Sequence, residues 1–142
     1  MIKRIKTRMA SEQGFTLIEL LVVIIILGIL VAIAVPAYLS FAGKAKIAAA
    51  EANVRSAIPA AEAYYQDSVN NTNVDTYEGL NGTTLRTEAP GVAPGVQAGS
   101  ATPFDSYCIQ DTEGTTTYSY QGGTAGPATI VSGACPTTYS VS

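Results

Sequence analysis

The chain has no histidine and only two cysteines among its 142 residues. Histidine is the commonest general base of enzymes, and the carboxylates outside the N-terminal region are scattered among turn residues. No glycine-rich loop is followed by the lysine of a phosphate cradle. Lysine and arginine number eight in all and form no basic stripe. The composition therefore argues against an enzyme, a bound cofactor or a direct nucleic-acid site.

Charge is almost missing from one long stretch near the N-terminus. Between residues 13 and 44 the only charged residue is Glu19, and every side chain over 20–35 is apolar or glycine. A helix rises about 1.5 Å per residue, so one over 15–41 is roughly 40 Å long. Because the hydrocarbon core of a bilayer is about 30 Å thick, this stretch is predicted to span a membrane.

A short basic segment precedes the apolar stretch. Four basic residues against Glu12 leave the first fourteen residues with a charge of +3, and the net charge of −3 leaves −6 for the rest. The positive-inside rule places the basic end in the cytoplasm and the chain after Phe41 outside. Residues 1–14 have the character of a removable leader. An ordinary secretory signal cut at Ala32-Ile33-Ala34 is the alternative, but its apolar run would be unusually long.

The junction between leader and apolar stretch reads Gly14-Phe15-Thr16-Leu17-Ile18-Glu19. It resembles the processing site of the type IV prepilin family, which includes the pseudopilins of type II secretion. The resemblance implies that a prepilin peptidase cuts between Gly14 and Phe15 and N-methylates Phe15. It also implies a role for Glu19 in assembly. The match covers residues 14 to about 41, and beyond that only the general layout agrees.

Glu19 should make insertion of the apolar stretch into a membrane less favourable. A carboxylate at bilayer depth costs roughly 2.5–3.5 kcal/mol on insertion scales, so a partner is expected. Cleavage creates one, the α-amino group of Phe15, which can meet Glu19 of a neighbouring subunit and enforce axial register. The alternative is a carboxylate near the interface that snorkels or stays protonated.

Two residues inside the apolar stretch predict an irregularity. Pro36 removes a backbone hydrogen bond, at about 3 kcal/mol in a helix interior. The resemblance implies that the region from Gly28 to Pro36 can lose helicity in an assembled pilus. A static kink in the helix is the alternative.

The residues that follow predict an amphipathic helix over 42–69. Its apolar face is formed by residues spaced 7, 4, 3 and 4 apart, namely Ile47, Val54, Ile58, Ala61 and Tyr65. Glu51 and Arg55 have the spacing of a weak i, i+4 ion pair, and Pro59 predicts a second bend. The run Asn70-Asn71-Thr72-Asn73 is expected to end the helix.

Residues 70–142 predict a loop and a small β-sheet. The loop, to about residue 103, contains a short helix or turn over 77–85 that buries Leu80 and Leu85. Alternating residues predict strands over 104–110, 115–121 and 128–132, a weaker one over 92–98, and a turn at 111–114. Tyr107 and Ile109 share a face. We therefore expect an α+β fold, a long helix packed on a small antiparallel sheet, which matches the pilin fold that the resemblance implies.

Several other residues carry predictions of their own. In an exported chain, Cys108 and Cys135 are expected to form one disulfide, which the resemblance to pilins also favours. The remaining features are weaker: Asp105, Asp111 and Glu113 as calcium ligands, Lys44 and Lys46 facing acids of a neighbouring subunit or solvent, and glycosylation at Asn70 and Asn81. The eight tyrosines suit packing better than an electron-conducting stack.

These observations together predict a type IV prepilin that becomes a structural subunit of an extracellular filament. It would be a single-pass protein of the inner membrane before it polymerises with copies of itself. The family implies prepilin peptidase, an inner-membrane platform protein and an assembly ATPase as partners. A type II secretion pseudopilin or a minor or competence pilin is the alternative within the family. A membrane-tethered binding domain that never polymerises is the alternative from another class.

Overall fold

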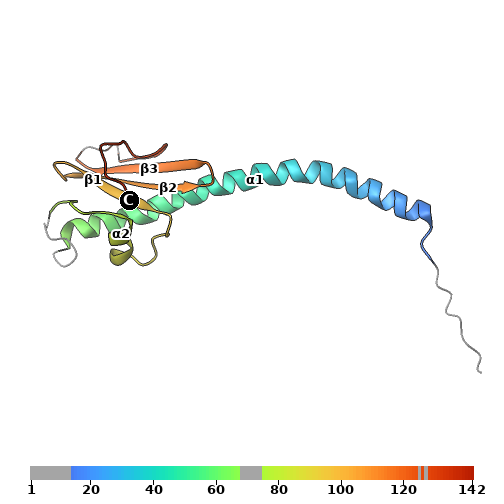
Figure 1. Cartoon of the computed structure of the whole chain (residues 1–142), viewed down its shortest axis with the longest axis horizontal. Coiled ribbons are helices and arrows are strands. Elements are labelled where there is room, and N and C mark those ends of the chain that lie inside the picture. The colour runs from blue at the N-terminus through green and yellow to red at the C-terminus, as the bar shows by residue number, and fades with distance from the viewer. Residues whose placement is uncertain (1–13, 68–74, 125, 127) are drawn as a thin grey trace, which may run out of the picture. The chain divides into compact units, whose positions relative to one another are not determined.

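The computed structural model describes residues 14–67, 75–124, 126 and 128–142. The leader over 1–13 and the predicted helix end at Asn70 to Asn73, with its glycosylation sequence, lie outside the described residues. The described residues form two helices and four strands: α1 (Leu17–Gln66), α2 (Gly82–Glu88), β1 (Gln97–Ala101), β2 (Ser106–Glu113), β3 (Thr116–Gly123) and β4 (Ile130–Ser132). Figure 1 labels the two helices and the first three strands. The chain divides into two compact units, Met1–Ser40 and Phe41–Ser142, and α1 contributes to both.

The first part of α1 has no buried face. Every large hydrophobic side chain from Phe15 to Phe41 is exposed, from 46% at Leu21 to 90% at Phe15. Within the described residues, α1 is the one helix long and apolar enough to cross a membrane. It stays helical through Gly28 and Pro36. The loss of helicity between these two residues, expected for the assembled filament, remains a prediction.

The second part of α1 packs into the core of the second unit. Its buried residues are small except at the end: Ala50, Val54, Ala57, Ala60, Ala61 and Tyr64. Val54 and Ala61 lie on the predicted apolar face, as do Ile58 and Tyr65, which pack against the core while partly exposed. The expected fold, a long helix packed on a small antiparallel sheet, is confirmed.

The sheet has the order β1-β2-β3-β4, and every pairing is antiparallel. Tyr107 and Ile109 of β2 are fully buried in the core they share with α1, as their alternation predicts. The predicted range of β2, 104–110, is wrong at both ends. The strand begins at Ser106, because Phe104 has a φ of 69°. It continues through Asp111 to Glu113, where a turn was predicted, and the chain reverses at Gly114, whose φ is +68°.

The remaining strands are also displaced from their predicted ranges. The weak strand predicted over 92–98 is found at Gln97–Ala101, and the last strand is shorter than predicted, at Ile130–Ser132. Val92 and Val96 are buried apolar residues of the loop that precedes β1. The final residues of the chain then pair with β1: Ser142 N–H donates to the Ala98 carbonyl at 3.1 Å, and Ala98 N–H donates back at 3.4 Å.

The short helix falls later than predicted, at Gly82–Glu88 instead of within 77–85. Asn81 explains the shift, because its side-chain oxygen accepts hydrogen bonds from the backbone N–H groups of Thr83 and Thr84. This capping box fixes where the helix begins. Leu80 and Leu85 are buried, as predicted.

Candidate processing and assembly site

The predicted processing site lies at the start of α1. Gly14, Phe15 and Thr16 precede the helix, which begins at Leu17. The Glu19 carboxylate accepts two hydrogen bonds at Oε2, from Thr16 N–H at 2.9 Å and from the Thr16 hydroxyl at 2.7 Å. Glu19 N–H donates in turn to the Thr16 hydroxyl at 3.2 Å. This reciprocal arrangement is a capping box, which satisfies backbone donors at the helix start.

The capping box has two chemical consequences. It places a carboxylate at the N-terminal end of the helix, where the helix dipole favours negative charge. It also uses only Oε2 of Glu19, so Oε1 remains for another donor. The Phe15 nitrogen is an amide in the uncut chain and becomes an amine only if the bond after Gly14 is cut.

Thr16 is a residue that the sequence reasoning missed. The pattern Thr16-x-x-Glu19 is itself the sequence signature of a capping box. The prediction for Glu19 concerned a partner in another subunit. In the structure its carboxylate has a partner three residues away in its own chain.

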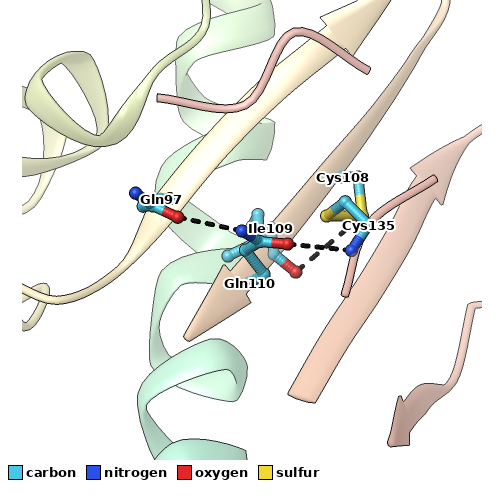
Figure 2. The surroundings of a disulfide bond; sticks show 5 residues. All are labelled: Gln97, Cys108, Ile109, Gln110 and Cys135. Carbon is cyan, nitrogen blue, oxygen red and sulfur yellow. Dashed lines mark hydrogen bonds between the residues drawn. A yellow bond between two sulfur atoms is a disulfide. The ribbon is translucent and has the colours of Figure 1, made fainter. Parts of the chain in front are cut away.

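In the second unit, the two cysteines form a disulfide between Cys108, on β2, and Cys135, near the C-terminus. Their Cα atoms are 5.9 Å apart, and the bond closes a separation of 27 residues. Figure 2 shows the glutamines beside it. Gln110 Oε1 accepts a hydrogen bond from Cys135 N–H at 2.8 Å, and Gln110 Nε2 donates to Gln97 Oε1 at 2.9 Å. The C-terminal segment is thus tied to β1 and β2 by one covalent bond and a polar chain.

A carboxylate on α1 connects that helix to the sheet. Glu62 Oε1 accepts a hydrogen bond from the Tyr107 hydroxyl at 2.7 Å, and Oε2 accepts one from the Tyr77 hydroxyl at 3.1 Å. Burial and the Glu62 carboxylate both raise the pKa of Tyr77 and of Tyr107 above the ordinary value of 10.0. No sequence signal indicates this cluster, because its members are 15 and 45 residues apart.

The carboxylates considered as calcium ligands do not come together. Asp111 is 1% exposed and faces α1, where its Oδ2 accepts a hydrogen bond from Asn53 Nδ2 at 2.8 Å. Its Oδ1 is buried and has no partner among the described residues. Glu113 ends β2, and Asp105 precedes that strand. Among the described residues no three potential metal ligands are grouped.

Asn81, the second residue considered for glycosylation, has a structural role. Its oxygen caps α2, and its nitrogen donates to the Gly79 carbonyl at 2.9 Å. Both polar atoms of the side chain are therefore engaged in the fold. The ion pair predicted between Glu51 and Arg55 is present at 2.9 Å on the exposed surface of α1.

The comparisons with known proteins point to the same N-terminal region. Residues 9–35 match the family described as the prokaryotic N-terminal methylation motif. Over this segment the chain is similar to type IV pilins and to a type II secretion core protein. Among its relatives are the type IV major pilin protein PilA of Myxococcus xanthus, 38% identical over 56 residues, and the type II secretion system core protein G of Pseudomonas aeruginosa, 40% identical over 58 residues. The type IV narrow pilus major component PilA5 of Thermus thermophilus is 56% identical over 48 residues.

These alignments cover only part of each protein. They span 39% of this chain and 26% of the Myxococcus pilin, 41% of both this chain and core protein G, and 32% of this chain and 41% of PilA5. No solved structure matches the chain. The names of these relatives describe pilins, a fimbrial protein and a secretion-system core protein. The match therefore supports a role for the N-terminal region. We call the second unit, Phe41–Ser142, the head.

Proposed function

We propose that this chain is a type IV prepilin whose processed form is a structural subunit of an extracellular, pilus-like filament. One observation carries the proposal. The first part of α1 is apolar and exposed along its whole length. Its first turn contains the Glu19 carboxylate, which caps the helix start and lies five residues after the glycine of a methylation motif. A water-exposed surface of this kind needs lipid or other protein around it. A prepilin supplies both in turn, the membrane first and copies of itself afterwards.

Processing acts on the residues that precede the helix. A prepilin peptidase cuts between Gly14 and Phe15, releases the basic leader over 1–14 and N-methylates Phe15. Because the helix begins only at Leu17, the bond to be cut lies outside regular helical structure. This supports access by a peptidase at the cytoplasmic face of the inner membrane. Segment 15–41 then remains as a single transmembrane span, and the positive-inside rule places the C-terminal side outside.

Assembly uses the amine that processing creates. The Phe15 amine of an incoming subunit reaches Oε1 of Glu19 in a subunit already placed, while Thr16 keeps Oε2. In the low dielectric among apolar helices this attraction is strong, and it fixes the axial position of each subunit. The apolar side chains of neighbouring helices replace lipid around residues 15–41. The region from Gly28 to Pro36 adapts there by losing part of its helicity.

The remaining segments of the chain form the head. The second part of α1, which ends at Gln66, carries the loop and sheet, and the disulfide between Cys108 and Cys135 closes them. An inner-membrane platform protein and an assembly ATPase drive polymerisation. A second candidate is a pseudopilin of a type II secretion system, which the similarity to core protein G favours. The disulfide that closes the head favours a pilus over a pseudopilus.

A pair of glutamate variants tests the proposal. We expect Glu19→Ala to be inserted into the membrane and to contain a folded head, yet to form no surface filaments. The matched control is Glu51→Ala, which removes another exposed carboxylate of α1 and should leave filaments intact. Filament yield is measured by shearing and electron microscopy, and insertion by resistance to carbonate extraction. Normal filaments from Glu19→Ala would refute the proposed assembly, as would a wild-type chain that never polymerises.

A further inference from the structure

The positive charges of the processed chain are few and unevenly placed. After Gly14 the sequence contains four: Lys44, Lys46, Arg55 and Arg86. Arg55 is paired with Glu51 at 2.9 Å, and Arg86 Nη1 lies 3.4 Å from two loop carbonyl oxygens. Neither lysine has an ion pair or hydrogen bond with another described residue. Lys44 and Lys46 therefore have no partner among the described residues, and both lie just after the apolar segment.

The sequence around the lysines has the composition of a membrane interface. Tyr38 and Phe41, exposed at 70% and 72%, are the last aromatic residues of the apolar segment. Aromatic rings followed by lysines typify the level of the lipid headgroups, where long basic side chains reach the phosphates. Lys44 is 25 residues after Glu19, or about 38 Å of helix. This exceeds the hydrocarbon core of about 30 Å, so with Glu19 at one boundary the lysines reach the headgroups of the other.

Lys46 lies close to the sheet. Its side chain lies near the turn between β2 and β3: a Cβ at Gly114 would be 3.2 Å from its Cδ and 3.4 Å from its Nζ. Both lysines are exposed. A ligand at this place therefore meets two exposed lysine side chains, one of them beside the hairpin.

We propose that Lys44 and Lys46 bind the phosphates of anionic phospholipids at the outer surface of the membrane while the subunit is unassembled. This binding sets the depth of the apolar segment, and it rests on the membrane placement given in the proposed function. The partner is lipid, because the lysines adjoin the apolar segment and the rest of the processed chain is acidic. Acidic residues of a second copy are the competing partner.

The test uses the full processed chain, reconstituted at a low protein-to-lipid ratio. One set of vesicles is pure phosphatidylcholine and the other contains one third phosphatidylglycerol. The rate of lysine acetylation by a water-soluble reagent is measured at each lysine by mass spectrometry. We expect acetylation of both lysines to be about fivefold slower in the anionic vesicles, and the difference to vanish in 1 M salt.

Matched variants link the lysines to depth. Hydrogen exchange over residues 40–46 should speed up in anionic vesicles when both lysines become glutamine, and stay unchanged when both become arginine. Equal acetylation in the two vesicle types would overturn the inference. So would protection that depends on protein density instead of lipid charge, which would identify a second copy as the partner. A chain that does not insert into vesicles at all would refute the proposed membrane state itself.

Discussion

Ile25 and Val131 are both exposed hydrophobic residues, at 52% and 41%, but they stand in opposite surroundings. Ile25 belongs to the stretch over 20–35, in which every side chain is apolar or glycine and every large one is exposed. Val131 lies on the edge strand of a head that has its own core of alanine, tyrosine, valine, leucine and isoleucine side chains. A single exposed apolar residue is ordinary on a protein surface, whereas a continuous apolar surface indicates a binding partner. The same exposure therefore has a different meaning in each region.

The largest expected effect separates these two residues directly. Ile25→Lys places a charge near the middle of the apolar segment, at roughly 2.5–3.5 kcal/mol on insertion scales. We expect it to abolish filaments and to reduce carbonate-resistant insertion. Val131→Lys, the matched change in the head, should leave both unchanged. Equal tolerance of the two substitutions would contradict the distinction between the two regions.

The next effect concerns the head alone. Replacing Cys108 and Cys135 together by serine removes a crosslink across 27 residues. Chain entropy predicts a loss of about 3 kcal/mol in the free energy of unfolding of the head. Chemical denaturation followed by tyrosine fluorescence measures this loss, and membrane insertion serves as the unaffected control. A head of unchanged stability would show that the disulfide does not restrain its fold.

Alkaline pH should lower the free energy of unfolding of the head by an amount comparable to the loss of the disulfide. Tyr77 and Tyr107 are 4% and 0% exposed, and their pKa values are raised in the folded state. In the unfolded chain they ionise near 10.0, so the unfolded state loses protons first as the pH rises. The stability they confer is complete below pH 10 and declines above it, by about 1.4 kcal/mol per tyrosine per pH unit. Denaturation midpoints that stay constant from pH 9 to 11 would contradict this account.

A smaller effect distinguishes two carboxylates of α1. Glu62→Ala leaves two buried tyrosine hydroxyls without their acceptor, so we expect a loss of about 2 kcal/mol in head stability. Glu51→Ala breaks only an exposed ion pair and should cost a few tenths of a kcal/mol. Urea titrations of both variants give the comparison. Similar losses would mean that Glu62 acts as an ordinary surface residue.

Sequence patterns predict the two regions unequally well. The apolar segment and the motif at Gly14 are local features, so composition and spacing suffice to find them. The core side of α1 was indicated by the spacing of Val54 and Ala61, and both are fully buried. Leu80 and Leu85 were also placed in the core correctly. These residues share a property, since each is apolar and has a periodic or strongly local signal.

The errors arise where a distant partner or a backbone angle decides. Asp111 is a typical turn residue, yet it continues β2, where it is paired with Tyr118 of β3. The Asn53 side chain of α1, 58 residues away, donates a hydrogen bond to its carboxylate. Phe104 is an aromatic residue of the kind that favours a strand, but its φ is positive and β2 begins only at Ser106. The Glu62 cluster joins residues from a helix, a loop and a strand, so no window of sequence contains it. Thr16 is different, because its capping pattern was present in the sequence and was overlooked.

The most direct test of the account is the N-terminus of the protein that reaches the cell surface. Surface filaments are purified by shearing, and their N-terminal peptide is analysed by mass spectrometry. The account predicts a chain that begins at N-methylated Phe15 and keeps all of residues 15–41. A surface protein that begins after Ala34, without the apolar segment, would contradict it.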